Sequence, residues 1–275
     1  MKTTRIALIL MSVLFTNKLL AQDVIEEIIV TSSFIEQNLD QIHNPIHVIG
    51  SDELASMASQ SLGESLDDLM GVGTSDYGSA VGQPIIRGMS GARVKVLKNG
   101  MVNRDVSGLG VDHLNDVDLN DISQIEIVKG PSSLMYANGT IGGIINIVDD
   151  CIAALNYELP ELKVGYETQS VNDGNAEYVN LKSNIGGFNV NFGHKNTDFG
   201  NYDIPGGAII HAEEEHDDHE EEEHDEHEEN LGYVNNSDYA VESTKFGMSK
   251  VGDWGYLGFS VDNLESVYGI PFHGD

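Results

Sequence analysis

This chain has one cysteine and few basic residues for its number of acidic ones. Its 275 residues contain 14 Lys and Arg against 45 Asp and Glu, for a formal net charge of −31. The single cysteine, Cys151, excludes a framework of intrachain disulfides, and we expect it to be a small buried apolar residue. Ser-His-Asp order, a phosphate loop and an HExxH motif are also absent, so the sequence indicates no enzyme. Beyond the N-terminus no apolar run reaches about 20 residues, so membrane residence would require β-strands.

One segment consists only of carboxylates and imidazoles. From Glu213 to Glu229, thirteen of seventeen residues are acids and four are histidines. Like charges and the lack of apolar surface predict no fold of its own for this run. A merely solvated acidic loop needs no imidazole, so we interpret the run as a collector of divalent metal ions. Its candidate ligands, with one histidine just upstream, are His211, His216, His219, His224 and His227.

The N-terminus has the three parts of a secretory signal. Lys2 and Arg5 give a positive start, residues 6–15 form an apolar centre, and Leu19–Ala21 end in a small residue. Residues 1–21 are therefore a predicted signal peptide, and we expect the mature chain to be exported.

Residues 41–150 predict a compact α+β domain. Ser51 is a suitable N-cap for one helix, and leucines at helical spacing predict a second helix from Leu62 to Met70. Glycine-rich turns separate apolar runs that are typical of strands. We expect these strands at 45–49, 84–87, 94–97, 125–128 and 144–148.

After Asp150 the helical periodicity ends, and residues 151–275 show the alternation of strands. We expect five, at 162–169, 176–185, 188–198, 240–250 and 255–264. Lengths of about ten residues with aromatic side chains near the ends indicate an outer-membrane barrel wall, and a soluble β-sandwich is the alternative. Bacterial single-chain barrels have even strand numbers from about 8 upward, so five strands cannot close one. We therefore expect the sequence to be the front of a longer protein or a truncated product.

Two segments of the first domain resemble the plug of TonB-dependent outer-membrane receptors. They are PIIRGMSGARVKVLKNG (84–100) and IEIVKGPSSLMYANGTIGGIINIV (125–148), in the family's order ahead of the strands. The resemblance implies an α+β plug domain followed by the first antiparallel strands of a transmembrane β-barrel, in the outer membrane of a Gram-negative cell. It implies active uptake of a scarce solute, with the TonB–ExbB–ExbD energy-coupling complex and outer-membrane lipid as partners. It implies no nucleic-acid partner and no required cofactor.

Residues 22–40 contain a segment that resembles a TonB box, the short strand that these receptors present to TonB. Its residues are Glu26, Glu27, Ile28, Ile29, Val30 and Thr31.

The segment DVSGLGVDHLNDVD (105–118), followed by the second plug motif and NIVDD, resembles the zinc-uptake branch of these receptors. In that branch an Asp-His pair on an outward-facing plug loop contributes to the metal site, which implies this role for Asp112 and His113. Two adjacent residues do not complete a tetrahedral zinc site, so further ligands from the barrel are implied. The branch usually follows NIVD with a basic residue and proline, whereas this chain has Asp-Cys-Ile-Ala (150–153), a departure at the joint between plug and barrel.

Strand counting places the acidic run on an outer loop at about residues 200–238, because the plug connection enters the barrel from the periplasmic side. Neutral imidazoles and a strong negative field suit the capture of cations through many exchangeable sites. We therefore expect Zn²⁺ to be the transported ligand, collected by the run and passed to Asp112 and His113. Affinity order alone would favour Cu²⁺ over Zn²⁺.

Two other functions share part of this pattern. A haem or ferric-siderophore receptor would have the same plug and barrel, but haem needs one or two placed axial ligands, and thirteen carboxylates would repel anionic siderophore complexes. A non-transporting surface protein could bind cations through the run, but a plug has no use outside a pore.

Overall fold

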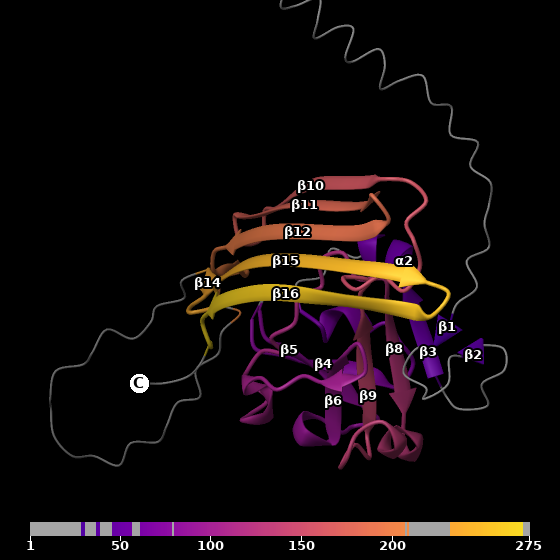
Figure 1. The fold of residues 1–275 in the computed structure, drawn as a ribbon. Coiled ribbons are helices and arrows are strands. Elements are labelled where there is room, and N and C mark those ends of the chain that lie inside the picture. Colours follow the sequence, from indigo (N-terminus) through magenta and orange to yellow (C-terminus); the bar gives the residue numbers. More distant parts are fainter. Residues whose placement is uncertain are drawn as a thin grey trace, which may run out of the picture.

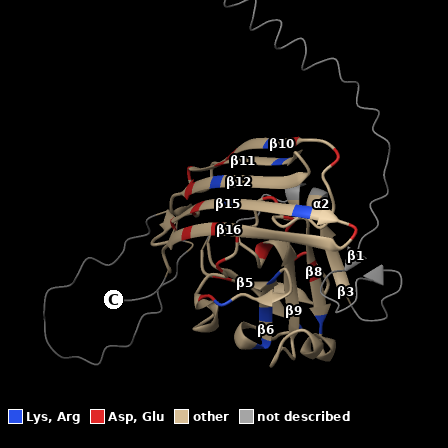
Figure 2. Cartoon of the chain, viewed as in Figure 1, with Lys and Arg blue, Asp and Glu red and all other residues tan. Residues whose placement is uncertain are grey.

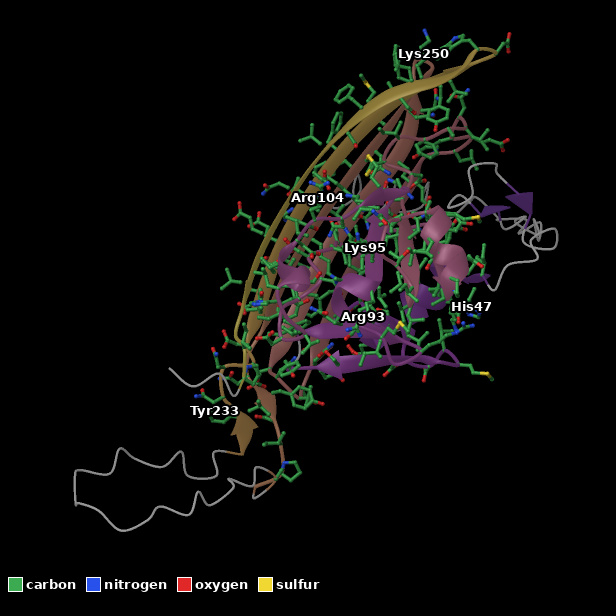
Figure 3. All side chains as sticks on the ribbon, turned by 90° about the horizontal axis from the view of Figure 1, so that it is seen from below. His47, Arg93, Lys95, Arg104, Tyr233 and Lys250 are labelled. Carbon is green, nitrogen blue, oxygen red and sulfur yellow. The ribbon has the colours of Figure 1, made fainter. Side chains whose placement is uncertain are left out.

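The computed structural model describes residues 29–30, 37–38, 46–56, 61–78, 80–206, 208 and 232–271. A small mixed domain lies under a curved sheet of long strands and packs against its concave face (Figures 1 and 3). The predicted signal peptide lies outside the described residues. Within them, no helix has the length and apolarity needed to cross a bilayer.

The domain is built on a five-stranded sheet of order β3-β8-β9-β6-β7, in which only β6 and β9 pair in parallel. A separate antiparallel pair, β4–β5, lies beside it. The strands are β3 (Ile46–Gly50), β4 (Val72–Asp76), β5 (Gly82–Ile86), β6 (Val94–Lys98), β7 (Met101–Val102), β8 (Gln124–Lys129) and β9 (Gly143–Val148). The helices are α2 (Ser51–Ser56) and the 3-10 turns η2 (Glu64–Leu66), η3 (Gly91–Arg93), η4 (Val106–Gly108) and η5 (Pro131–Met135).

The core lies on both faces of the two central strands. Ile125 and Ile127 of β8 point to one cluster, and the alternating Val128 points to another. Strands buried on both faces read as continuous apolar runs, which is why β8 and β9 were predictable from the sequence. Glu126 is the buried exception, and its carboxylate accepts a hydrogen bond of 2.9 Å from the Asn146 amide of β9.

The helix predicted from Leu62 to Met70 is wrong. This segment contains only the 3-10 turn η2, although Leu62 and Leu66 are buried as their spacing indicated. The backbone is bound to β5 instead: Gly63 N donates to Gly82 O at 2.8 Å, and a Cβ on Gly63 would lie 2.5 Å from that oxygen. Close packing on β5 therefore replaces helical hydrogen bonding. Strand β4, which follows directly, has no apolar run and was not predicted.

The long sheet is antiparallel throughout, in the order β10-β11-β12-β15-β16. All five predicted strands are present and are slightly longer than expected, which confirms this part of the fold. They are β10 (Glu161–Gln169), β11 (Gly174–Ile185), β12 (Phe188–Phe199), β15 (Tyr239–Gly252) and β16 (Gly255–Tyr268). Short pairs add β1 (Ile29–Val30) with β2 (Gln37–Asn38), and β13 (Tyr202–Asp203) with β14 (Tyr233–Val234).

The two faces of the long sheet have the polarity of a membrane wall. On the convex face, Leu257 is 72% exposed and Val164 68% exposed, whereas on the concave face Asn189 is 1% and Asn191 2% exposed. A soluble sandwich has the opposite arrangement, with apolar side chains between its sheets. Barrel strands alternate apolar side chains toward lipid with polar ones toward the lumen. The five strands therefore resemble barrel wall, not half of a sandwich.

The long sheet has two distinct ends. One is the linker end, named for the linker between β9 and β10 that joins the small domain to the long sheet. Here β10 begins and β15 turns into β16; Lys250 marks this end in Figure 3. At the loop end, β12 leaves at Phe199 and β15 returns at its register partner Tyr239; Tyr233 lies just beyond. The acidic run lies in sequence between Phe199 and Tyr239, and these two residues are at the end of the sheet opposite the linker.

Candidate metal site

Asp112 and His113 are the predicted site residues that the structure describes in full. They are half-buried and follow η4 on the way to β8. We call residues 105–116, which include η4, the apex loop. The five predicted histidine ligands of the acidic run, His211, His216, His219, His224 and His227, lie outside the described residues. Of the segment resembling a TonB box, only Ile29 and Val30 are described, and they pair with Asn38 and Gln37.

Asp105 closes the base of the apex loop. Its Oδ1 caps η4 by accepting the Ser107 backbone N–H at 3.0 Å. Its Oδ2 accepts the Asp116 backbone N–H at 2.9 Å and the Asn103 amide at 2.9 Å. One carboxylate thus joins the two ends of the loop, and it is occupied by backbone donors, as is usual for an Asp at a cap.

Gly110 brings the two candidate ligands together. A Cβ on Gly110 would lie 2.2 Å from Asp112 Oδ1 and 3.6 Å from His113 Cδ2. Both side chains therefore lie over the same glycine, so a carboxylate oxygen and an imidazole ring face one small region of space. Oxygen and nitrogen donors of this kind are what Zn²⁺ accepts from proteins.

The loop end of β16 approaches the same pair. His113 Nδ1 lies 3.4 Å from Tyr268 Oη, and the Ser266 hydroxyl donates to Asp116 Oδ1 at 2.9 Å. These contacts join residues about 150 positions apart, and nothing in the sequence between them signals their proximity. A hydrogen bond on one ring nitrogen fixes the orientation of an imidazole and leaves the other nitrogen for a metal.

The pair is supported from below by a small apolar cluster. Leu114 packs there with Val81 of the small domain and with Phe199 and Tyr239 of the long sheet. The rings of Phe199 and Tyr239 lie 5.4 Å apart at a tilt of 42°. The loop that carries the candidate ligands is therefore packed against both parts of the chain.

Asp112 and His113 supply two donors, and the described residues contain no group of three or more His, Cys, Asp or Glu suited to holding a metal ion. A zinc site needs three or four protein ligands. Within the described residues the pair therefore remains a two-donor arrangement, and the further ligands expected from the sequence stay a prediction.

The concave face of the sheet holds the small domain through buried lysines, and Figure 2 shows basic segments on β10, β11, β12 and β15. Lys182 Nζ lies 3.1 Å from Asp121 Oδ2 and 2.9 Å from Asp150 Oδ1. Lys245 Nζ donates to the Asn120 carbonyl, and the amides of Asn120 and Asn180 exchange two hydrogen bonds of 3.0 and 2.9 Å. The turn 120–121, which contains Asp121, therefore contacts basic side chains of the long sheet β10-β11-β12-β15-β16, which we call the wall.

The segment after Asp150 runs directly along the wall. A Cβ on Gly247 would lie 1.9 Å from the Cys151 carbonyl oxygen, and the Ser249 hydroxyl donates to Ala153 O at 2.7 Å. Cys151 is buried, as predicted. Burial, and next the carboxylate of Asp149, raise the pKa of its thiol to about 12. The departure from the family's pattern at residues 150–153 thus lies where linker and wall touch.

The first part of the chain matches a known domain family. Residues 38–144 match the TonB-dependent receptor plug domain. The vitamin B12 transporter BtuB of Photobacterium profundum is 28% identical over 152 residues, which is 54% of this chain and 25% of that protein. BtuB of Vibrio vulnificus is 24% identical over 52% of this chain and 24% of its own length. The chain thus spans about a quarter of these curated relatives.

Solved structures share the fold over most of the chain. The pyoverdine outer membrane receptor FpvA of Pseudomonas aeruginosa PAO1 superimposes with a TM-score of 0.63, at 11% identity, over 88% of this chain and 31% of its own. The copper transporter OprC does so with a TM-score of 0.59, at 14% identity, over 83% of this chain and 32% of its own. These relatives are transport proteins, not enzymes. The chain therefore carries a TonB-dependent receptor plug domain, followed by antiparallel strands that resemble the barrel of such receptors.

Proposed function

We propose that the protein is an outer-membrane receptor that imports a divalent metal ion, zinc, with energy transmitted by TonB. The observation that carries the choice of cargo is the Asp112–His113 pair. Both side chains lie over Gly110 on the apex loop, at the end of the long sheet where Phe199 and Tyr239 flank, in sequence, the connection that contains the acidic run. In this proposal the run collects Zn²⁺ and the plug pair receives it.

The fold alone does not choose the cargo. The relatives named above transport vitamin B12, copper or a siderophore, so one plug-and-wall architecture serves chemically different solutes. The donor types on the apex loop are the specific argument for a metal cation. Haem and ferric-siderophore uptake remain the competing functions, and the density of carboxylates disfavours an anionic siderophore complex.

Titration calorimetry of Zn²⁺ into the full chain tests the plug pair. We expect Asp112→Asn and His113→Ala each to weaken binding at the plug about ten- to a hundredfold, since each removes one of few strong donors. To isolate this site, the titrations use a background in which the five histidines from His211 to His227 are replaced by Gln. Wild-type affinity in both variants would refute a metal role for the pair.

Growth of a deletion strain separates the cargoes. Under the zinc hypothesis the strain grows poorly when zinc is chelated and normally when iron is chelated. The reverse result would support ferric-siderophore or haem uptake. Normal growth under both conditions would favour a surface protein that binds cations without transporting them.

A further inference from the structure

Gln83 of β5 lies directly beneath the apex loop and is 2% exposed. Its Nε2 lies 3.0 Å from Ser107 O, 2.7 Å from Gly110 O and 2.6 Å from His113 O. Because all three neighbours are carbonyl oxygens, only the amide nitrogen can face them, and the orientation of the side chain is fixed. One buried amide thus gathers three carbonyls of one short loop.

These three carbonyls span the segment that bears the candidate ligands. Ser107 and His113 lie at its two ends, and Gly110 lies in the middle beneath Asp112. The hydrogen bond from His113 N to Gly110 O within the loop is long, at 3.4 Å, whereas two of the three bonds to Gln83 are 2.7 Å or shorter. Asp105 and the turn η4 hold the start of this segment, through Ser107 N to Asp105 Oδ1 at 3.0 Å and Leu109 N to Val106 O at 2.9 Å. The short contacts at Gly110 and His113, next to the candidate ligands, come from Gln83.

The hydrogen-bonding arrangement suits an amide in particular. The two N–H hydrogens serve three acceptors, so at least one hydrogen is shared. A side chain without donors would remove the Gln83 hydrogen bonds from three half-buried carbonyls and leave Gly110 O only the long bond from His113 N. A carboxylate of the same length would bring a negative charge against three carbonyl oxygens. Methionine fills nearly the same volume but has no hydrogen-bond donor, and glutamate keeps the shape but replaces the neutral amide with a negative charge.

We propose that Gln83 is a positioning residue for the metal pair. It touches neither metal nor ligand side chain, and it fixes the backbone from which Asp112 and His113 extend. This inference rests on the proposed function, because it assigns Gln83 a purpose only if the pair binds a metal ion. A site held to within about 0.5 Å by its supporting groups keeps its affinity, and a looser one loses it.

Co²⁺ is the probe, because its visible absorption reports the geometry of its ligands as well as occupancy. Full-length chain in the His-to-Gln background is titrated as wild type, Gln83→Met and Gln83→Glu. We expect both variants to bind Co²⁺ about ten- to a hundredfold more weakly and to show an altered absorption band. Hydrogen exchange at the amides of residues 107–113 should be faster in both. Because one variant is apolar and the other is negatively charged, the second still tests the proposal if the first fails to fold.

Asn180→Leu is the matched control. This buried amide bonds Asn120 at the wall and not the apex loop, so its loss tests general damage to the protein. We expect wild-type Co²⁺ affinity and spectrum in Asn180→Leu. Equal loss in Asn180→Leu and Gln83→Met would show that any buried amide has this effect, and would overturn the inference.

The outcomes separate the two proposals. If Asp112→Asn and His113→Ala lose Co²⁺ while the Gln83 variants bind as wild type, the positioning role is wrong and the metal site stands. If Asp112→Asn and His113→Ala also bind as wild type, the proposed metal site fails and the inference falls with it.

Discussion

At the scale of single residues, the spacing of the candidate ligands depends on a missing methyl group. Gly108 and Gly110 are two residues apart on the apex loop, and neither has a positive φ. A Cβ at Gly108 meets nothing within 4 Å, whereas one at Gly110 would lie 2.2 Å from Asp112 Oδ1. The same substitution therefore has different consequences at the two positions.

We predict that Gly110→Ala weakens Zn²⁺ binding about tenfold or more, because the new methyl group displaces the Asp112 carboxylate. Gly108→Ala should leave affinity unchanged and controls for the general effect of replacing glycine by alanine, which is below about 1 kcal/mol where space permits. Calorimetry in the His-to-Gln background measures both. Equal affinities for the two variants would contradict the placement of Asp112 over Gly110.

Cys151 should be chemically inert in the folded chain. With its thiol pKa raised to about 12 by burial, roughly one molecule in ten thousand is ionised at pH 8, against about a quarter for a free thiol. We predict alkylation at pH 8 on the order of a thousandfold slower than in urea-unfolded chain. Similar rates in both states would show that the linker is open to solvent.

The same thiol predicts a dependence of stability on pH. Its folded pKa lies above the unfolded value, so the folded state favours the neutral form. Its contribution to stability is complete below about pH 8.5 and is lost as the pH rises toward 12. Urea unfolding of wild type and Cys151→Ala across this range checks the sign, because only the wild type carries this contribution.

Some residues of the candidate site were predictable from the sequence, and others were not, because they come from distant strands. Asp112 and His113 were identified because they lie in a recognisable segment. Tyr268 and Gln83 approach that segment from other strands, and contacts between distant strands leave no local pattern in a sequence. The sequence shows only a glutamine next to Pro84; that its side chain is buried, and which carbonyls its amide binds, is seen only in the structure.

At the scale of elements, the turn 120–121 is a polar junction between plug and wall. Its Asp121 has a positive φ of 50°, a conformation that is uncommon for non-glycine residues and that Asp and Asn adopt more readily than others. Two wall lysines lie near its carboxylate. Lys182 is nearly buried and lies 3.1 Å from Asp121, whereas Lys163 is half exposed and lies 3.8 Å from it.

We predict that Lys182→Met destabilises the folded chain by about 3–5 kcal/mol, because it leaves the carboxylate of Asp121 buried without its partner. Lys163→Met provides the matched control at the same carboxylate, with an expected cost of about 0–1 kcal/mol, since an exposed ion pair contributes little. Urea unfolding of the two variants measures the difference. Equal costs would contradict the larger contribution assigned to the buried Lys182.

Strands were easier to predict here than helices. In β8 and β9 both faces are buried, and in the wall the two faces differ in polarity, so each case leaves a clear pattern in the sequence. The segment after Leu62 has helical spacing over too short a length, and its packing on β5 decides its conformation. Strand β4 is held by its pairing with β5 and carries no apolar run of its own.

At the scale of the whole molecule, plug and wall are joined covalently by a segment that also packs between them. Residues 151–153 pack against two glycines of the wall: Gly247 of β15 approaches the Cys151 carbonyl, and Gly258 of β16 approaches the Ile152 side chain. The Ser249 hydroxyl completes the contact by donating to Ala153 O. The linker is thereby fixed to strands about a hundred residues later in the chain.

This contact predicts that the wall controls access to the linker thiol. In Gly247→Ala the new Cβ would lie 1.9 Å from a backbone oxygen, which cannot move aside as a flexible side chain can. We expect residues 151–153 to be displaced from the wall, lowering the pKa of Cys151 and speeding its alkylation by about tenfold or more. Gly73→Ala is the control, because a Cβ at Gly73 meets nothing within 4 Å and its φ is not positive. Faster alkylation in Gly247→Ala alone would show that the contact between Gly247 and the Cys151 carbonyl holds the linker against the wall. Unchanged alkylation would place the linker away from β15.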